Sequence, residues 1–332
     1  MQYRSLGKSR IKVSVIGFGA WGIGGDLYGP ADDAESLSAL NKAFDEGVNF
    51  FDTADLYGDG HSESLIGAAF AGRRDEVVVA TKFGSLAHFG NYDFSPAYIT
   101  SAVEDSLGRL RTDYIDLYQL HSPPLAVIED SPGTFDALSR LKEAGKIRAI
   151  GISARSPEDG LAAAGLFPFD AIQVNFNLAD QRAREVGFLE ECARRDIGVI
   201  VRTPLCFGFL TGTLQETTAF DADDHRRTWS AEQRRLWAEA PGRFEKMWAA
   251  RDQTPTQFAL SFCLSHAGVS TVIPGMMKVS EVEENLQGAE AGLSDEELQR
   301  IYDIYGEYVW FKGKSDRIRE ARANEEVEMS NR

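Results

Sequence analysis

The chain has 332 residues, of which 43% are hydrophobic and 26% charged, proportions of a folded globular protein that exclude wholesale disorder. With 35 Lys and Arg against 51 Asp and Glu, the net charge is −16, which argues against nucleic-acid or anionic-membrane partners, since both bind basic patches. No apolar run approaches the roughly 18 residues of a membrane span, and no secretory signal opens the chain. Three widely spaced cysteines are typical of a reducing compartment. We therefore expect a cytoplasmic protein.

Short apolar runs rich in Val, Ile and Phe alternate with longer amphipathic stretches along the chain. After a small hairpin expected over 2–12, the apolar runs predict strands at 13–18, 48–52, 76–82, 115–120, 147–152, 170–174, 197–203 and 270–273. Helical patterns follow each strand, at 32–46, 62–71, 96–111, 131–145, 157–165, 181–195, 254–267 and 279–288. Ser95-Pro96 and Ser156-Pro157 are typical of helix starts.

Eight strands, each followed by a helix, predict one α/β domain over residues 1–332, a (β/α)8 TIM barrel spanning about 13–290. The gap before the last strand is longer than the others because residues 204–250 form a polar segment, with one further helix expected at 230–238. Long loops on this face of a barrel are usually functional and often form lids. His225 of this segment and the surrounding carboxylates are expected to form a solvated face. A C-terminal extension, 291–332, ends in a charged tail.

The segment 17–22 (GFGAWG) matches the dinucleotide-binding pattern G-x-G-x-x-G. That pattern requires a helix directly after the loop and an acidic residue about 20 positions further on. Residues 23–30 (IGGDLYGP) cannot form a first helical turn, and Asp52 lies 35 residues after Gly17. We therefore reject a Rossmann domain, and expect these glycines to let the backbone approach a ligand with Trp21 in the pocket.

Polar side chains collect where the second, third and fourth predicted strands end. Asp52 ends one strand and Tyr57 follows five residues later, Lys82 ends the next, and His121 ends the third. Because the strand ends of a barrel converge on one mouth, these four side chains are expected to share a site.

The chemistry of these four residue types is coherent. A tyrosine, with an ordinary pKa of about 10, becomes a better proton donor or base when a nearby ammonium lowers that pKa. A carboxylate keeps the ammonium of Lys82 charged and oriented, and a histidine can hydrogen-bond a carbonyl oxygen where negative charge develops. The set suits placing a proton on oxygen while hydride reaches carbon.

These segments resemble the catalytic segments of bacterial-type aldo-keto reductases: 51–58 (FDTADLYG), 81–82 (TK) and 117–121 (LYQLH). The resemblance runs from about residue 3 to 290. It implies a (β/α)8 barrel and reversible hydride transfer between a nicotinamide cofactor and the carbonyl of an aldehyde, ketone or oxidised sugar. In that family Tyr57 would be the general acid, Lys82 would tune it, Asp52 would hold Lys82, and His121 would orient the carbonyl.

The same resemblance implies the cofactor contacts. Ser153 and Gln173 would grip the carboxamide, although Ala154 stands where the family commonly has Asn. Arg202 replaces a stacking tyrosine, and its guanidinium can either stack or reach a phosphate or a substrate anion. The remaining implied contacts are Pro204, Leu205, Phe207, Gly208 and Leu210 on the pyrophosphate, and Gly275, Lys278, Glu284 and Asn285 at the adenosine end. Lys278 favours NADP(H); NAD(H) is the alternative, because Glu281 stands where a second basic residue is frequent.

The expected substrate pocket is aromatic and is lined by Trp21, Phe83, His88 and Trp310. The substrate is expected to be a small-molecule carbonyl or alcohol. The five histidines show no metal-ligand spacing, so no metal is expected, which disfavours a metal- or phosphate-dependent barrel lyase. The alternative function is a cofactor-sensing binding subunit with the same fold and slow or no turnover.

Overall fold

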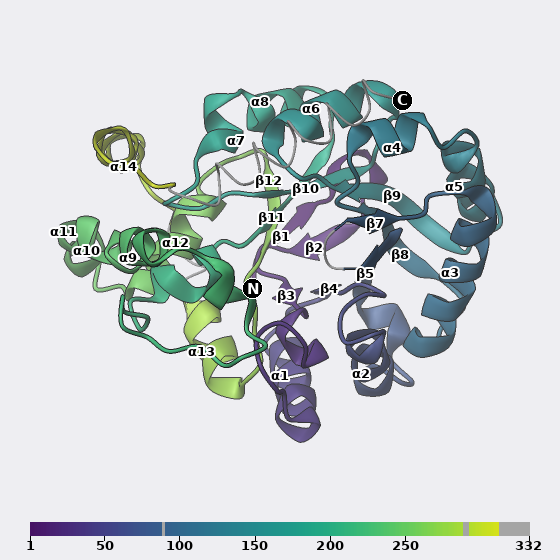
Figure 1. Ribbon diagram of the computed structural model, residues 1–332, viewed down its shortest axis with the longest axis horizontal. Helices are drawn as coiled ribbons and strands as arrows, with labels where there is room; N and C mark the ends of the chain where they lie inside the picture. Colours follow the sequence, from purple (N-terminus) through teal and green to yellow (C-terminus); the bar gives the residue numbers. More distant parts are fainter. Residues whose placement is uncertain (88–89, 288–291, 312–332) are drawn as a thin grey trace.

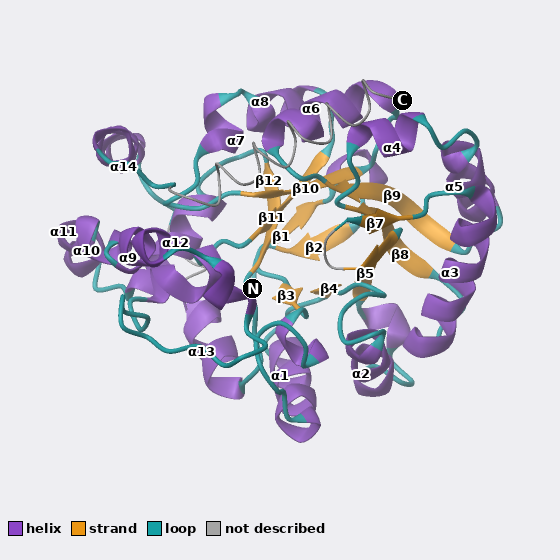
Figure 2. Ribbon diagram, in the orientation of Figure 1, coloured by secondary structure: helices purple, strands orange, loops and turns teal. Residues whose placement is uncertain are grey.

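The computed structural model describes residues 1–87, 90–287 and 292–311. Parallel strands lie at the centre of the molecule and a ring of helices surrounds them (Figure 1, Figure 2). The sheet has eight strands in the order β12-β11-β10-β9-β8-β5-β4-β3. Parallel bridges from Ile16 to Val272 and from Gly19 to Gly275 join its two edges. The predicted (β/α)8 barrel is confirmed.

The strands of the barrel are β3 (Phe18–Gly19), β4 (Phe50–Asp52), β5 (Val78–Phe83), β8 (Ile115–His121), β9 (Ile147–Ser153), β10 (Ala171–Asn175), β11 (Gly198–Arg202) and β12 (Val269–Ile273). The surrounding helices are α1 (Asp33–Asp45), α2 (His61–Ala69), α3 (Pro96–Leu110), α4 (Leu125–Glu129), α5 (Thr134–Glu143), α6 (Pro157–Leu166), α7 (Arg182–Glu185), α8 (Phe188–Arg194), α12 (Pro255–Leu264) and α13 (Val279–Gln287). None of the helices within the described ranges is long and apolar enough to cross a membrane.

Between β11 and α12 the chain makes a long detour, residues 204–254, which we call the excursion. It contains the 3-10 helices η4 (Cys206–Thr211) and η5 (His225–Thr228), then α9 (Ala231–Ala238), α10 (Ala240–Arg243) and α11 (Glu245–Ala250). The last helix of the described residues, α14 (Asp295–Glu307), lies outside the ring of helices in Figure 1. The predicted helix at 230–238 is confirmed by α9, whereas α10, α11 and α14 are additional.

Two predicted elements are divided in the structure. The strand expected at 13–18 becomes β2 (Lys12–Ser14), which pairs antiparallel with β1 (Tyr3–Ser5) in the N-terminal hairpin, and the short β3. The helix expected at 181–195 breaks at Gly187, whose φ of +70° is left-handed and so incompatible with a continuing helix. Two further strands, β6 (Ser85–Ala87) and β7 (Asn91–Tyr92), form a hairpin after β5.

Residue parity along the strands decides which side chains enter the barrel. In β5, Val78 and Ala80 belong to the apolar cluster inside the barrel, whereas Val79 and Phe83 pack with the helices. Because side chains of a strand alternate between its two faces, Lys82 points inward with Val78 and Ala80. The interior is therefore apolar along most of its length and becomes polar where the strands end.

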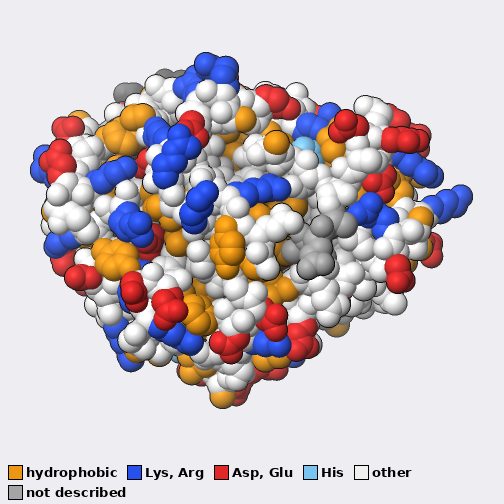
Figure 3. Space-filling view, turned by 180° about the vertical axis from the view of Figure 1, so that it is seen from behind, with side chains coloured by type: hydrophobic (Ala, Val, Ile, Leu, Met, Phe, Trp, Pro, Cys, Tyr) orange, Lys and Arg blue, Asp and Glu red, His pale blue; other side chains and the backbone are white. Residues whose placement is uncertain are grey.

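The surface charge is mixed. Seen from behind, basic and acidic side chains are interspersed over the whole visible face (Figure 3). On that face the net charge of −16 does not gather into one acidic field that would repel an anionic ligand at long range.

Candidate active site

Lys82 and Asp52 form a buried ion pair at the C-terminal ends of β5 and β4. The Lys82 Nζ lies 2.5 Å from Asp52 Oδ1, and it also donates to the Thr53 carbonyl oxygen at 2.8 Å and to the Tyr57 hydroxyl at 3.1 Å. The Lys82 side chain is 0% exposed. An ammonium so deeply buried needs such partners to remain charged. Three of the four predicted catalytic residues therefore form one hydrogen-bonded unit.

A tight turn after β4 carries Tyr57 to Lys82. The amide of Asp55 donates to the Lys82 carbonyl oxygen at 3.3 Å and the amide of Tyr57 to the Ala54 carbonyl oxygen at 3.2 Å. Gly58 follows with a φ of +60°, and a Cβ at this position would lie 2.1 Å from the Gly24 carbonyl oxygen. A glycine is thus required for the turn that delivers the tyrosine.

The second oxygen of Asp52 is held by two amides from across the barrel. Asp52 Oδ2 accepts from Gln119 Nε2 at 3.0 Å and from Gln173 Nε2 at 2.9 Å. Gln119 is absent from the sequence-based prediction, although its spacing of two from His121 on a predicted strand places both on one face. The two glutamines fix the carboxylate that in turn fixes Lys82.

Burial and charge act in opposite directions on the reacting groups. Burial raises the pKa of the Tyr57 phenol above its ordinary value, and the Lys82 ammonium reduces that rise without cancelling it. Burial lowers the pKa of Lys82, but the charges of Asp52 and Tyr57 outweigh it and the net shift is upward. The Lys82 ammonium does lower the tyrosine pKa, as the sequence predicts, but the sequence-based argument leaves out the larger effect of desolvation, which makes the net shift upward. At neutral pH the structure holds a neutral phenol beside a charged ammonium.

His121 completes the group at the mouth of the barrel. Its ring meets the Tyr57 ring edge-on, with centroids 5.7 Å apart at 83°. The next residue, Ser122, has a φ of +51°, a left-handed conformation that is strained for a side chain other than glycine and that is frequent beside functional sites. The structure thus brings together all four residues that the strand ends predict.

Arg202, at the end of β11, is hydrogen-bonded to the ends of the neighbouring strands. Its guanidinium donates to Asn175 Oδ1 at 2.7 Å, to the Ala154 carbonyl oxygen at 2.8 Å and to the Ser153 hydroxyl. Burial lowers the pKa of Arg202, while the nearby Tyr57 and Asp52 raise it. The residue therefore presents a fixed planar cation beside the catalytic group.

Gln173, whose side-chain amide is expected to bind a carboxamide, belongs to the same hydrogen-bond network as Arg202 and Asp52. Gln173 Oε1 accepts from the Ser153 hydroxyl at 3.2 Å, so Ser153 lies between Gln173 and Arg202. Side chains that both donate and accept suit an amide ligand.

The backbone after β11 carries a run of strained residues. Thr203, Cys206 and Phe207 have φ values of +51°, +48° and +58°, and Gly208 has +91°. Pro204 and Leu210 are buried, and Leu205, Phe207 and Gly208 are partly exposed. Clustered left-handed residues next to Arg202 indicate a loop shaped for a purpose other than stability.

Of the residues expected at the adenosine end, Gly275 and Lys278 precede α13, and Glu284 and Asn285 lie within its second half. Gly275 is exposed, with no atom within 4 Å of a Cβ built on it, and Lys278 is also exposed. Asn285 is buried, and Glu284 accepts a hydrogen bond from the Thr254 hydroxyl at 2.5 Å. Together with the amide, hydroxyl and guanidinium groups beside Lys82, this donor set fits a nicotinamide dinucleotide, since it offers amide partners at one end and a cation at the other.

The predicted aromatic pocket needs correction. Trp21 stacks on Tyr57 with ring centroids 5.8 Å apart, as a pocket residue should. Phe83 stacks on Tyr118, with ring centroids 4.3 Å apart, on the helix-facing side of β5. It points away from the barrel interior because it directly follows the inward-pointing Lys82 on the strand, so the prediction that Phe83 lines the pocket is wrong. Trp310 is 3% exposed and packs between Phe244 of the excursion and Tyr305 of α14. His88 lies outside the described residues.

The glycines of segment 17–22 serve barrel closure. A Cβ on Gly17 would lie 2.8 Å from the Phe50 ring, and one on Gly19 would lie 2.8 Å from the Ile273 carbonyl oxygen. Gly17 and Gly19 thus let the backbone approach the adjacent strands, which leave no space for side chains, and the approach of this segment to a ligand stays a prediction. The segment leads into the short 3-10 helix η2 (Gly22–Gly24), as expected for a chain without a Rossmann turn.

The expectation of a solvated face around His225 holds for Asp221 and Asp223, which are exposed, and is wrong for His225 and Asp224. His225 is 6% exposed and Asp224 is 5% exposed, although both belong to a polar stretch of the excursion. Sequence polarity could not reveal this, because the partners that cover them lie about 200 residues earlier in the chain, in the loop after β3.

Comparison with known proteins agrees with this geometry. The sequence profile of the Aldo/keto reductase family matches residues 15–305. The chain belongs to this family. It is 35% identical over 293 residues to the aldo-keto reductase YhdN of Bacillus subtilis, covering 85% of this chain and 87% of that protein. It is also 35% identical over 305 residues to the aldo-keto reductase yakc of Schizosaccharomyces pombe, whose name includes NADP(+), with 87% of each chain covered.

Solved structures of aldo/keto reductases show the same fold. The glycerol dehydrogenase AKR11B4 from Gluconobacter oxydans has a TM-score of 0.79 at 32% identity, covering 94% of this chain and 97% of that chain. The holo form of the aldo-keto reductase AKR11C1 from Bacillus halodurans has a TM-score of 0.74 at 30% identity, covering 92% and 96%. The protein is thus an oxidoreductase of a family that uses nicotinamide cofactors.

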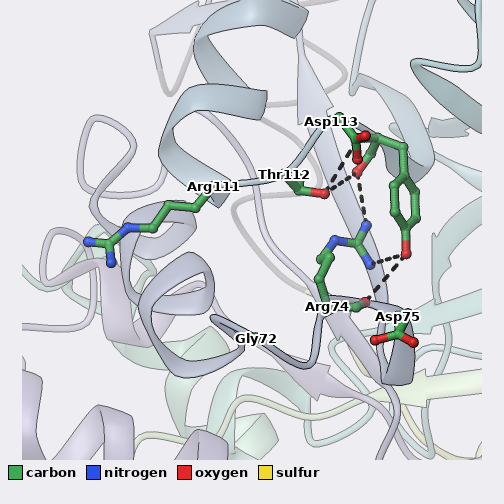
Figure 4. Close-up of a pocket in the computed structure, with 7 residues that line it drawn as sticks. Gly72, Arg74, Asp75, Arg111, Thr112 and Asp113 are labelled. Atoms are coloured by element: carbon green, nitrogen blue, oxygen red, sulfur yellow. Dashed lines mark hydrogen bonds between the residues drawn. The ribbon is translucent and has the colours of Figure 1, made fainter.

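A surface pocket of this aldo/keto reductase lies at the N-terminal ends of β5 and β8, away from the candidate active site at the C-terminal ends (Figure 4). It is lined by Gly72, Arg74, Asp75, Arg111, Thr112, Asp113 and Tyr114. Its Arg74 is engaged with the Asp116 carboxylate at 2.7 Å and lies over the Tyr114 ring at 4.2 Å. Because this end of a barrel serves stability, we assign it no ligand. Within the described residues, no group of three or more His, Cys, Asp or Glu side chains could hold a metal ion.

Proposed function

We propose that this aldo/keto reductase catalyses reversible reduction of a small aldehyde, ketone or oxidised sugar to the alcohol, with Tyr57 as the general acid. The observation that carries the proposal is the Tyr57 hydroxyl at 3.1 Å from a buried Lys82 ammonium, which Asp52 holds at 2.5 Å. A phenol kept neutral by burial has a proton to give. The adjacent ammonium stabilises the phenolate that remains after the transfer.

Each residue of the group has a separate task in this proposal. When bound, the reduced nicotinamide supplies the hydride that converts the carbonyl carbon to an alcohol carbon. His121 donates a hydrogen bond to the carbonyl oxygen, and Tyr57 transfers its proton to that oxygen as negative charge develops there. Asp52, fixed by Gln119 and Gln173, keeps Lys82 charged and aimed at the phenol. Trp21 bounds the pocket by stacking on the acid.

The proposed cofactor is NADP(H). Ser153 and Gln173 would hold the carboxamide, and Arg202 would lie against the ring. Pro204, Leu205, Phe207, Gly208 and Leu210 would follow the pyrophosphate, and Gly275, Glu284 and Asn285 would surround the adenosine. The exposed Lys278 supports a 2′-phosphate contact. The chain acts as a single domain, and its three free, buried cysteines support a cytoplasmic setting.

The test is cofactor oxidation across a carbonyl panel with a matched variant. Wild-type protein should oxidise NADPH with at least one aldehyde, ketone or oxidised sugar; glyceraldehyde and dihydroxyacetone belong in the panel because one structural relative is a glycerol dehydrogenase. Tyr57→Phe keeps the ring stacked on Trp21 and removes the acidic hydroxyl. It should lose turnover while its dissociation constant for NADPH stays within about twofold. Turnover in that variant equal to wild type would overturn the assignment of the acid.

A further inference from the structure

The 3-10 helix η5 places His225 of the excursion in the mouth of the barrel. The His225 amide donates to the Leu27 carbonyl oxygen at 3.0 Å, which ties the excursion to the loop after β3. The imidazole is T-shaped against Tyr28, with centroids 4.8 Å apart, and against Phe207, 5.4 Å apart. A polar residue of the excursion is thus packed between an aromatic ring of the loop after β3 and another ring of the excursion itself.

Trp21 connects this imidazole to the proposed acid. The His225 and Trp21 rings are stacked, with centroids 5.1 Å apart at 21°, and the Trp21 and Tyr57 rings are stacked at 5.8 Å and 21°. Tyr28 meets the Trp21 ring edge-on at 5.0 Å. Three nearly parallel rings therefore lead from the excursion to the residue that donates the proton.

The turn that carries His225 is held firmly. Asp224 accepts a hydrogen bond from the Arg226 amide at 2.8 Å and pairs with the Arg226 guanidinium at 2.6 Å. That guanidinium lies over the Tyr28 and Phe220 rings, at 5.1 Å and 4.6 Å. Because this turn is held by the Asp224–Arg226 ion pair, it fixes the position of the His225 ring and, through it, of the Trp21 ring.

The Tyr57 side chain is buried, and hydrogen-bond and ring contacts from three residues hold it. Lys82 holds the hydroxyl at 3.1 Å, and His121 meets the ring edge-on. Trp21 stacks on the ring, and Trp21 is itself held by rings that the excursion anchors. Rate losses of about 100-fold can follow displacement of a reacting group by about 1 Å. A small shift of Trp21 is therefore sufficient to affect proton transfer.

We propose that His225 is a positioning residue for Tyr57, and that seating of the excursion on Trp21 sets the orientation of the general acid. The inference rests on the proposed function, since it assigns His225 an effect on the same proton transfer. It also gives the excursion a role in the rate of the chemical step.

The test compares three substitutions of one residue. His225→Ala removes the ring, His225→Gln keeps a polar side chain without a ring, and His225→Phe restores a flat ring without nitrogen. Arg227→Ala is the matched control, since Arg227 is an exposed neighbour in the same turn. Single-turnover hydride transfer should fall about tenfold or more in the Ala and Gln variants and return to within about threefold of wild type in the Phe variant.

Two further measurements separate positioning from binding and from folding. The dissociation constant for NADPH should stay within about twofold in every variant, and the rate loss should be the same factor for small and large carbonyls. Near-ultraviolet circular dichroism of the cofactor-free protein, which reports on packed aromatic rings, should change in the Ala and Gln variants and recover in the Phe variant.

Several results would overturn the inference. Wild-type rates in the Ala and Gln variants would do so, as would a Phe variant no faster than the Gln variant, or cofactor affinity lost in proportion to rate. If the Ala variant fails to fold, the comparison of the Phe and Gln variants carries the test. An active Tyr57→Phe variant would instead contradict the proposed function, so the two failures are distinguishable.

Discussion

Asp55, two residues before Tyr57, offers a quantitative test of how burial acts near the site. Its Oδ2 accepts from the Tyr98 hydroxyl at 3.4 Å, and its Oδ1 has no hydrogen-bond partner among the described residues. Burial, reinforced by the nearby charge of Glu63 and opposed by Arg109, raises the pKa of Asp55 to about 7. Tyr98 and Tyr118 are also titratable neighbours, and burial raises the pKa of both.

The magnitude follows from the size of this shift. The pKa rises from 3.8 to about 7, and each pKa unit corresponds to about 1.4 kcal/mol. Because the folded state holds a proton that the unfolded state releases, Asp55 lowers the free energy of unfolding progressively as pH rises from about 4 to about 7. The full effect is about 4 kcal/mol, and partial contact of the side chain with water reduces it to about 2 to 4 kcal/mol.

The assay is urea unfolding of wild type and Asp55→Asn from pH 5 to pH 9. Asparagine stays neutral, so the free energy of unfolding of the variant does not fall with pH at this position. The difference in free energy of unfolding between Asp55→Asn and wild type should therefore grow by about 2 kcal/mol between pH 5 and pH 8 and then level off. Glu63, Arg109 and Tyr118 are present in both proteins and cancel in the difference. Asp59→Asn is the control, since Asp59 is exposed in the same loop and its φ of +53° suits asparagine. Parallel stability curves for wild type and Asp55→Asn would refute the reasoning.

Two further predictions concern the cations of the site. Lys82→Met leaves the Asp52 carboxylate buried without its counter-ion, so urea unfolding should show a loss of about 3 to 5 kcal/mol and hydride transfer should fall at least about 100-fold; a loss below about 1 kcal/mol would contradict the buried pair. Lys278→Ala should weaken NADPH about tenfold in a fluorescence titration and leave NADH unchanged, since only NADPH carries the 2′-phosphate. Equal effects on both cofactors, or tighter binding of NADH than NADPH by wild type, would remove the phosphate role of Lys278.

Strand periodicity is sufficient to predict the barrel and the core of the site. Parallel strands converge at their C-terminal ends, so Asp52, Lys82 and His121 could be placed together without knowing any contact. The structure adds that Tyr57 reaches Lys82 through a turn that only glycine permits at position 58. These features depend on local sequence and on one rule of topology.

Features that depend on register or on distant segments could not be predicted in this way. Phe83 is adjacent to Lys82 in sequence, but one residue of parity places it among the helices. His225 lies in a polar stretch, and its burial depends on Trp21 and Tyr28 from the other end of the chain. An apolar residue such as Trp310 is compatible both with a substrate pocket and with packing between helices. Its contacts with Phe244 of the excursion and Tyr305 of α14 show the packing role.

The central claim is that Tyr57 protonates a carbonyl oxygen while hydride reaches the carbonyl carbon. The most direct measurement is the deuterium content of the alcohol formed with NADPH deuterated at both C4 positions, by mass spectrometry, in wild type and Tyr57→Phe. We predict one deuterium on the former carbonyl carbon with wild type, and no product above background with the variant although it binds the cofactor. A wild-type alcohol without deuterium, or equal labelled product from both proteins, would contradict the account.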